Sequence, residues 1–83
     1  MGQGSRQKPK RLARKLVAIR TKVQLSQNEL IKRLGLEDEL TQARVSAYER
    51  GIREPSLLVL LAYARIVGIS TDVLIDDKLN LPK

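Results

Sequence analysis

The stretch that decides the fold is residues 26–51, SQNELIKRLGLEDELTQARVSAYERG. It contains two helix-sized segments, 26–35 and 41–51, and each opens with a hydroxyl residue followed by glutamine and closes on glycine. A hydroxyl side chain caps the first free amides of a helix, and glycine accepts the left-handed conformation that ends one. The pattern therefore predicts two successive short helices joined by a turn.

The first segment carries further helix signals. Ser26 is followed three residues later by Glu29, which is the spacing of a capping box. Leu30, Ile31 and Leu34 then supply a buried side.

The second segment is predicted to form a helix that begins after Thr41. Val45 and Tyr48 are three residues apart and face inward, while Ala43 and Ala47 permit close packing on either flank. Two helices arranged in this way form a helix-turn-helix, which can lay its second helix in the major groove of DNA.

Three further helices are predicted around this pair. Apolar residues recur on one face from Pro9 to about Lys22. Residues 57–67 are apolar nearly all round, so that helix is expected in the centre of the fold. A short fifth helix, capped by Ser70 or Thr71, runs to about residue 75.

These elements predict a single all-α domain of five helices. We place the domain at residues 9–76, with the helix-turn-helix core at 26–51, a flexible basic arm at 1–8 and a tail at 77–83. A chain of 83 residues buries only about 60% of its unfolded surface, which leaves little core around a deep catalytic cleft. The length therefore favours a binding module.

The chain contains neither cysteine nor histidine. Thiolate and imidazole are thus unavailable as metal ligands, nucleophiles or acid–base groups, and we expect no enzyme, no metal and no cofactor. The absence of cysteine is compatible with a reducing cytoplasm. The longest apolar run, Leu57 to Ala64, is shorter than the roughly 20 residues of a membrane span, and no signal-peptide pattern is present.

The net charge of +7 lies at one end of the chain. Residues 1–22 hold eight bases and no acid, whereas residues 23–83 hold eight bases and nine acids. This basic end, which includes Lys10 and Arg11, is expected to contact DNA phosphates. The alternative is a solvated tail that only aids solubility.

Capping, glycine and apolar positions recur in order across residues 12–76. They are Leu25-Ser26-Gln27-x-Glu29-Leu30, Leu34-Gly35, Val45-Ser46-x-Tyr48-Glu49-x-Gly51-x-Arg53-x-Pro55-Ser56, Leu60-Leu61, Ala64 and Gly68. These residues resemble the Cro and lambda-repressor-like helix-turn-helix proteins, also called the Xre family. The resemblance implies five helices, a homodimer on operator DNA, and transcriptional regulation in bacteria or their phages.

The resemblance also implies which side chains read DNA bases. Gln42 is similar to the family's base reader and can bond both N6 and N7 of adenine, whereas Arg44 can reach O6 and N7 of guanine. Ser46 and Ala47 could touch a thymine methyl or the backbone. The competing interpretation is that all four are simply exposed on a helix surface.

Other residues are expected to grip the DNA backbone. By the resemblance, the glutamine that opens the second helix contacts a phosphate and supports the base-reading glutamine. Two arginines in the loop after the third helix hold phosphates, unless they are free in solvent. The backbone-contacting residues are then Gln27, Thr41, Arg50, Arg53, Lys10 and Arg11. Glu49 is interpreted as structural, bonding backbone or an arginine of the first helix.

The sequence departs from the family at residues 37–40, which resemble an insertion before Thr41. The turn should therefore be longer than usual. Three consecutive acids would be repelled by phosphate, so we expect them to point away, cap the next helix or contact something other than DNA. Alternatively, the third helix begins near Asp38.

A second function remains open at this point. The domain could be an antitoxin or adaptor whose acidic insertion and tail, Leu79 to Pro82, bind another protein. RNA binding or a membrane-surface role comes third, because the apolar face of the basic segment is required by the core. Double-stranded DNA is the expected partner, and no small-molecule ligand is evident.

Overall fold

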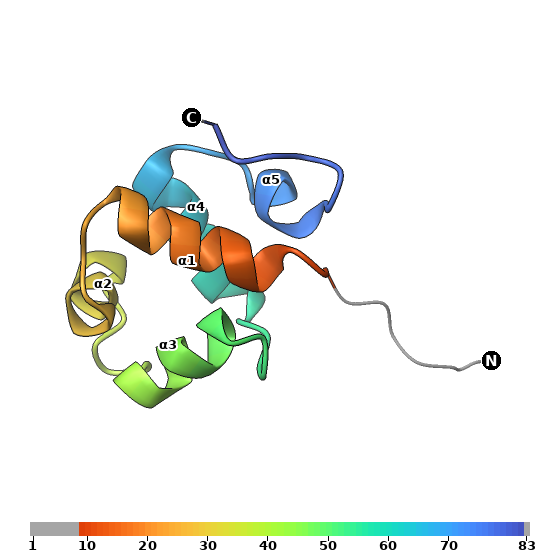
Figure 1. Cartoon of the computed structure of the whole chain (residues 1–83). Coiled ribbons are helices and arrows are strands. Elements are labelled where there is room, and N and C mark those ends of the chain that lie inside the picture. Colours follow the sequence, from red (N-terminus) through yellow and green to blue (C-terminus); the bar gives the residue numbers. More distant parts are fainter. Residues whose placement is uncertain (1–8, 83) are drawn as a thin grey trace.

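The computed structural model describes residues 9–82, so the predicted basic arm at 1–8 lies outside the described residues. The helices are α1 (Leu12–Lys22), α2 (Gln27–Leu34), α3 (Gln42–Glu49), α4 (Leu57–Val67) and α5 (Thr71–Ile75) (Figure 1). The prediction of an all-α, five-helix fold is confirmed. Within residues 9–82, none of the helices has the length and apolar character needed to cross a membrane.

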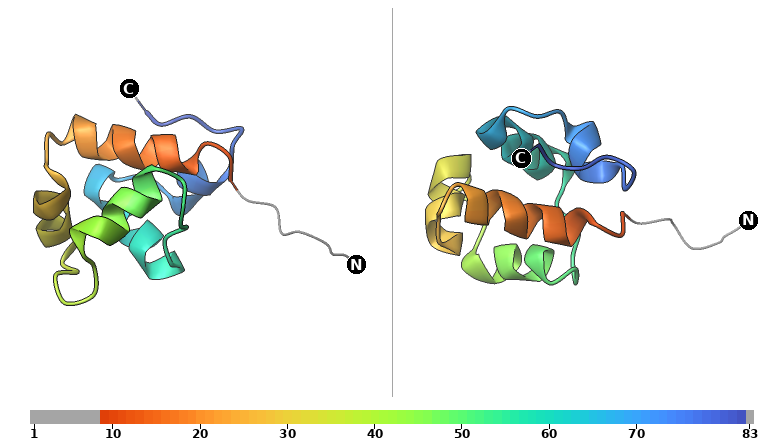
Figure 2. Two further views of the ribbon diagram at one scale, coloured as in Figure 1. Left: turned by 60° about the horizontal axis from the view of Figure 1, so that its bottom comes forward. Right: turned by 45° about the horizontal axis from the view of Figure 1, so that its top comes forward.

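The first helix holds the domain together. α1 packs against α3, α4 and α5, and α2 packs against α3 and α4. Every helix contributes a fully buried side chain to one core: Leu16 and Ile19, Leu30, Val45, Tyr63 and Leu74. α3 and α5 lie on opposite sides of α1 (Figure 1 and the right-hand view of Figure 2). Within α3, Gln42, Ala43 and Arg44 remain exposed.

The capping signals of the helix-turn-helix act as the sequence predicts. Ser26 Oγ accepts from the backbone N–H of Glu29 at 3.1 Å, and Glu29 Oε1 accepts from the backbone N–H of Ser26 at 2.8 Å. These hydrogen bonds hold the pKa of Glu29 below its usual value. Thr41 caps α3 with its hydroxyl oxygen, and Gly35 ends α2 in the left-handed conformation, with φ at 73°.

The turn between α2 and α3 is long, and its acids face solvent. Residues 37–39 are exposed, whereas Leu40 is buried and its N–H donates to the carbonyl of Leu36 at 2.9 Å. α3 begins at Gln42, so the alternative start near Asp38 is excluded. The buried leucine anchors the turn to the core and leaves the acids pointing outward.

The start of α1 differs from the prediction. The helix begins at Leu12 instead of Pro9, and Arg11 at its N-cap makes no side-chain cap of its own. The residues just before the helix are held from the other end of the chain, because the carboxylate of Asp77 accepts from the backbone N–H of Lys10 at 2.9 Å and of Arg11 at 3.0 Å. A contact between residues so distant in sequence is invisible to local pattern.

The segment predicted as a tail lies along α1. The guanidinium of Arg11 donates to the carbonyl of Asp77 at 2.6 Å and to Asn80 Oδ1 at 2.6 Å. Lys15 Nζ donates to the carbonyls of Val73 and Asp76 at 2.7 and 2.9 Å. Arg11 and Lys15 thus hold the C-terminal residues, while Leu79, Asn80 and Pro82 remain exposed.

Two packing expectations are wrong. The first turn of α4 is not buried, because Leu57 and Leu58 are 78% and 75% exposed. The buried positions of this helix form one stripe, at Val59, Leu60, Tyr63 and Ala64. Ala43 is also exposed, so it is not the close-packing position that was expected.

Candidate nucleic-acid interface

The N-terminal ends of α2 and α3 meet through their polar side chains. Gln42 Nε2 donates to Gln27 Oε1 at 3.4 Å, and Asn28 Nδ2 donates to Gln42 Oε1 at 3.4 Å. Gln42 and Asn28 are exposed, whereas Gln27 is half-buried. The amide of Gln42 is therefore held from both sides and still faces solvent.

A buried carboxylate lies behind this amide pair. Glu49 Oε1 accepts from Gln27 Nε2 at 3.1 Å and from Arg20 Nη2 at 3.0 Å, while Glu49 Oε2 accepts from Arg20 Nε at 2.6 Å. The Glu49 side chain is only 7% exposed. Its hydrogen bonds raise the pKa of Arg20 above the usual value. The expectation that Glu49 bonds an arginine of the first helix is confirmed.

These side chains form one connected set across three helices. Arg20 comes from α1, Glu49 and Gln42 from α3, and Gln27 and Asn28 from α2. We refer to these five residues as the polar network. It joins the interior of the domain to the exposed start of α3.

The first turn of α3 presents its side chains to solvent. Gln42 and Arg44 are exposed, whereas Ser46 and Ala47, further along the helix, are half-buried. Val45 is fully buried beneath them and holds the helix against the core. The helix thus projects a glutamine amide and a guanidinium from its uncovered end.

A compact loop follows α3. Gly51 has a φ of 75°, and the N–H groups of Ile52 and Arg53 both donate to the carbonyl of Ala47, at 2.9 and 3.3 Å. These hydrogen bonds give a partner to a free carbonyl at the end of α3, and the chain turns sharply there. Arg50 and Arg53 are exposed on either side of the glycine.

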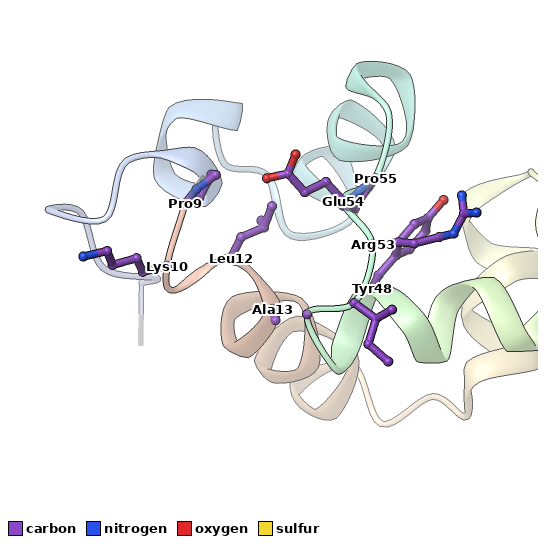
Figure 3. A pocket seen from close by; sticks show the side chains of 10 residues that line it. Pro9, Lys10, Leu12, Ala13, Tyr48, Arg53, Glu54 and Pro55 are labelled. Atoms are coloured by element: carbon purple, nitrogen blue, oxygen red, sulfur yellow. The ribbon is translucent and has the colours of Figure 1, made fainter. Parts of the chain in front are cut away.

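The loop and the start of α1 enclose a shallow hollow of about 140 Å³, seen in Figure 3. Tyr48, Ala13 and Pro55 contribute to its lining. Lys10 points away from the loop that carries Arg53 (Figure 3). These two predicted phosphate contacts therefore do not converge on one point.

The structure brings together part of the predicted site. Gln27, Thr41, Gln42 and Arg44 lie at the joined ends of α2 and α3, and the two loop arginines lie at the other end of α3. Arg11 is apart from both, because its guanidinium holds the C-terminal segment.

The contact of Asn28 with Gln42 was not predicted from the sequence. The position of Asn28 directly after Gln27 at the start of a helix was the available signal, because consecutive residues there share the uncovered end. The link from Glu49 to Gln27 had no local signal, since 22 positions separate the two residues.

Comparisons with known proteins identify the family and the fold. A family profile described as helix-turn-helix matches residues 10–74. A comparison with curated protein sequences found no significant match. Among solved structures, the fold is similar to the P22 c2 repressor protein in complex with synthetic operator 9T, determined in the presence of Tl⁺. That match has 27% sequence identity and a TM-score of 0.67, and covers 80% of this chain and 94% of the repressor chain.

Proposed function

We propose that this chain, which belongs to the Cro/lambda-repressor-like helix-turn-helix family, is a transcription regulator that recognises a specific double-stranded DNA sequence. The observation that carries the proposal is the uncovered first turn of α3, where Gln42 and Arg44 face solvent. A helix placed in this way can enter the major groove while the preceding helix crosses the backbone.

Base recognition is assigned to the exposed side of α3. Gln42 offers one donor and one acceptor, which suit N7 and N6 of adenine, and Arg44 offers the paired donors that suit guanine. Ser46 and Ala47, which are half-buried further along the helix, would meet a thymine methyl or the sugar-phosphate backbone. Each mismatched base pair should then cost about 1–3 kcal/mol of binding free energy.

Backbone contacts are assigned to the ends of α2 and α3 and to the loop that follows. Arg50 and Arg53 are exposed cations beside the base-reading helix, and each phosphate that they neutralise adds to the salt dependence of binding. Gln27 and Thr41 stand at the helix starts, where phosphate oxygens are bound favourably. Lys10 is retained as a more distant contact.

Arg11 is assigned differently. Its guanidinium already has two acceptors at 2.6 Å in the C-terminal segment, and a phosphate would have to displace them. We therefore assign Arg11 to holding that segment.

We further propose that two copies bind an inverted repeat. Two recognition helices related by a two-fold axis would enter successive major grooves about 34 Å apart. Ile52, Leu57 and Leu58 are 63–78% exposed, and such apolar surface is available for contact with a second copy.

Selection of bound duplexes from a random pool, at a stated salt concentration, tests the proposal. We expect enrichment of an inverted repeat whose half-sites are about 10 base pairs apart from centre to centre. Recovery of a pool as random as the starting one would contradict it.

A further inference from the structure

We propose that the C-terminal halves of α2 and α4 bind an acidic segment of another protein, one that also carries apolar side chains. The surface is defined by the side chains that line a single hollow of about 310 Å³: Arg33, Leu34, Ala62, Arg65 and Ile66. We refer to it as the α2–α4 surface. The inference goes beyond the proposed function and does not depend on it, because none of these residues is assigned to DNA.

α4 carries more apolar surface than the core covers. Its buried positions form one stripe, at Val59, Leu60, Tyr63 and Ala64. With 3.6 residues per turn, Leu61, Ala62 and Arg65 fall on the other side of the helix. Leu61 and Ala62 are half-buried there, and Arg65 is exposed. A helix side that faces only water is normally polar, so apolar side chains at these positions favour a contact outside the domain.

α2 supplies the other half of the surface. Leu34 of α2 and Ile66 of α4 pack against the hydrophobic core but remain half-buried. Together with Ala62 they form the apolar part of the hollow. Arg33 and Arg65 are exposed and line the same hollow, one from each helix. The hollow therefore combines an apolar part with two cations.

Arg33 and Arg65 are available for an acidic partner. Within residues 9–82, neither guanidinium makes a hydrogen bond or an ion pair. By contrast, Arg11 and Arg20 are each held by an oxygen atom of the fold at 2.6 Å. A guanidinium pairs favourably with a carboxylate, often through two parallel hydrogen bonds. A segment that places Asp or Glu beside Leu, Ile or Phe would therefore match both the charge and the apolar part of the hollow.

The competing explanation is that the arginines only stabilise their own helices. Each lies in the last turn of a helix, where a cation is favourable beside the free carbonyls. This accounts for the charges but not for the apolar side chains in the same hollow. Lys32 shares the last turn of α2 and is exposed, but it does not line the hollow. It therefore provides a control for the helix-end effect.

Two other occupants fit the α2–α4 surface less well. DNA phosphates would pair with the arginines but would leave the apolar part of the hollow against a charged backbone. A second copy related by a two-fold axis would place this surface against itself, so guanidiniums of like charge would meet. A partner of opposite charge avoids both conflicts.

Selection from a phage-displayed library of short random peptides, with the whole chain as bait, tests the chemistry of the partner. We expect the enriched peptides to combine Asp or Glu with Leu, Ile or Phe. Their Kd should rise about 10-fold in the double variant Arg33→Ala, Arg65→Ala, because two exposed ion pairs are lost. A pool with no enrichment over a selection without protein would overturn the inference.

Two single variants are the matched controls. Lys32→Ala removes a cation from the same helix end, and Arg50→Ala removes one from the loop after α3. Neither should change the Kd of the peptides by more than about twofold. An equal rise in Lys32→Ala would reduce the effect to general positive charge. A larger rise in Arg50→Ala than in the double variant would place the peptides on the other side of the domain. Either result would overturn the inference.

A gain of binding guards against misfolding. The charge-reversed variant Arg33→Glu, Arg65→Glu should bind the same peptides once their acids are replaced with lysine, and should bind them more tightly than the wild type does. Circular dichroism compares the helicity of both double variants with that of the wild type. Folded double variants that bind the original peptides as tightly as the wild type would refute the role of the arginines.

Backbone amide shifts locate the contact and separate it from DNA binding. Addition of an enriched peptide should shift the ¹H–¹⁵N signals of Leu34, Ala62 and Ile66, whereas shifts centred on α3 would overturn the inference. The double variant Arg33→Ala, Arg65→Ala should bind random DNA with unchanged affinity. Weaker DNA binding with unchanged peptide binding would make the two arginines phosphate contacts and would also overturn it.

Discussion

Arg20 on α1 and Glu49 on α3 form a two-pronged ion pair, with Nε to Oε2 at 2.6 Å and Nη2 to Oε1 at 3.0 Å. The same guanidinium donates from Nη1 to the carbonyl of Leu25 at 3.0 Å, just before α2. A single side chain thus ties three parts of the domain together. Because Glu49 also bonds Gln27, the pair links the stability of the fold to the geometry of the exposed surface.

Replacing Arg20 with methionine should destabilise the protein by about 2–3 kcal/mol. The carboxylate of Glu49 would stay buried without its charged partner. The side chain of Arg20 is 23% exposed and that of Glu49 is 7% exposed. Because the arginine is partly solvated, the loss of stability is smaller than for a fully buried pair. Urea unfolding measures the change. Arg14→Met, at an exposed position of the same helix, should change stability by less than about 0.5 kcal/mol; equal stability of the two variants would refute this assignment.

Replacing Gln24 with glycine should stabilise the protein. Gln24 has a φ of 59° at the end of α1, a conformation that strains any residue with a β-carbon. Relief of this strain, less the greater freedom of an unfolded glycine, should give a net gain of about 0.5–1 kcal/mol. The melting temperature should rise by about 2–8 °C.

A glycine placed inside a helix is the control, because it should lower the free energy of unfolding where Gln24→Gly should raise it. Lys32→Gly, in α2, should lose about 1 kcal/mol. A lower melting temperature for Gln24→Gly would show that the left-handed residue is not strained.

Asp77 should make stability depend on pH in the acid range. Backbone N–H groups of Lys10 and Arg11 hold the pKa of its carboxyl below the ordinary value of 3.8. The unfolded chain therefore binds more protons in acid, so the stabilisation is complete above about pH 4 and is lost as the pH falls through the lowered pKa of the folded state.

Asp77→Asn tests this dependence. The variant should melt below the wild type at pH 7, and the difference should shrink toward pH 2. Asp38→Asn, in the exposed turn before α3, should leave the melting profile unchanged. A difference in melting temperature between Asp77→Asn and the wild type that stays constant from pH 7 to pH 2 would refute this role of Asp77 at the start of α1.

Local signals predicted the helix-turn-helix well. Ser26, Glu29, Gly35 and Thr41 act through hydrogen bonds and backbone conformations that involve residues a few positions away, so short spacing identifies them. The open end of α3 followed from the same signals, because its cap fixed where the exposed turn begins.

The binding partners of the basic residues could not be predicted in the same way. A basic side chain can bind a DNA phosphate or the backbone carbonyls at the end of another helix. Only the tertiary fold determines which of these partners it has. Lys15 is buried and donates to Val73 and Asp76. Its position beside Leu16 on the apolar face was the signal that it points inward.

Arg50→Ala should weaken binding to specific and random DNA by the same factor. A phosphate contact carries no sequence information, and its loss should reduce the slope of log affinity against log salt by about 0.9. Titrations at several salt concentrations measure this slope. Arg65→Ala, exposed on α4, should leave it unchanged; a loss confined to the specific site would instead make Arg50 a base reader.

The most direct test of the account compares wild type with Gln42→Ala on the selected duplex and on its single-base-pair variants. We predict that the alanine variant loses about 1–3 kcal/mol of discrimination at one position of each half-site and keeps its preferences elsewhere. An unchanged preference at every position, in this variant and in the double variant Gln42→Ala, Arg44→Ala, would show that the exposed turn of α3 does not read DNA.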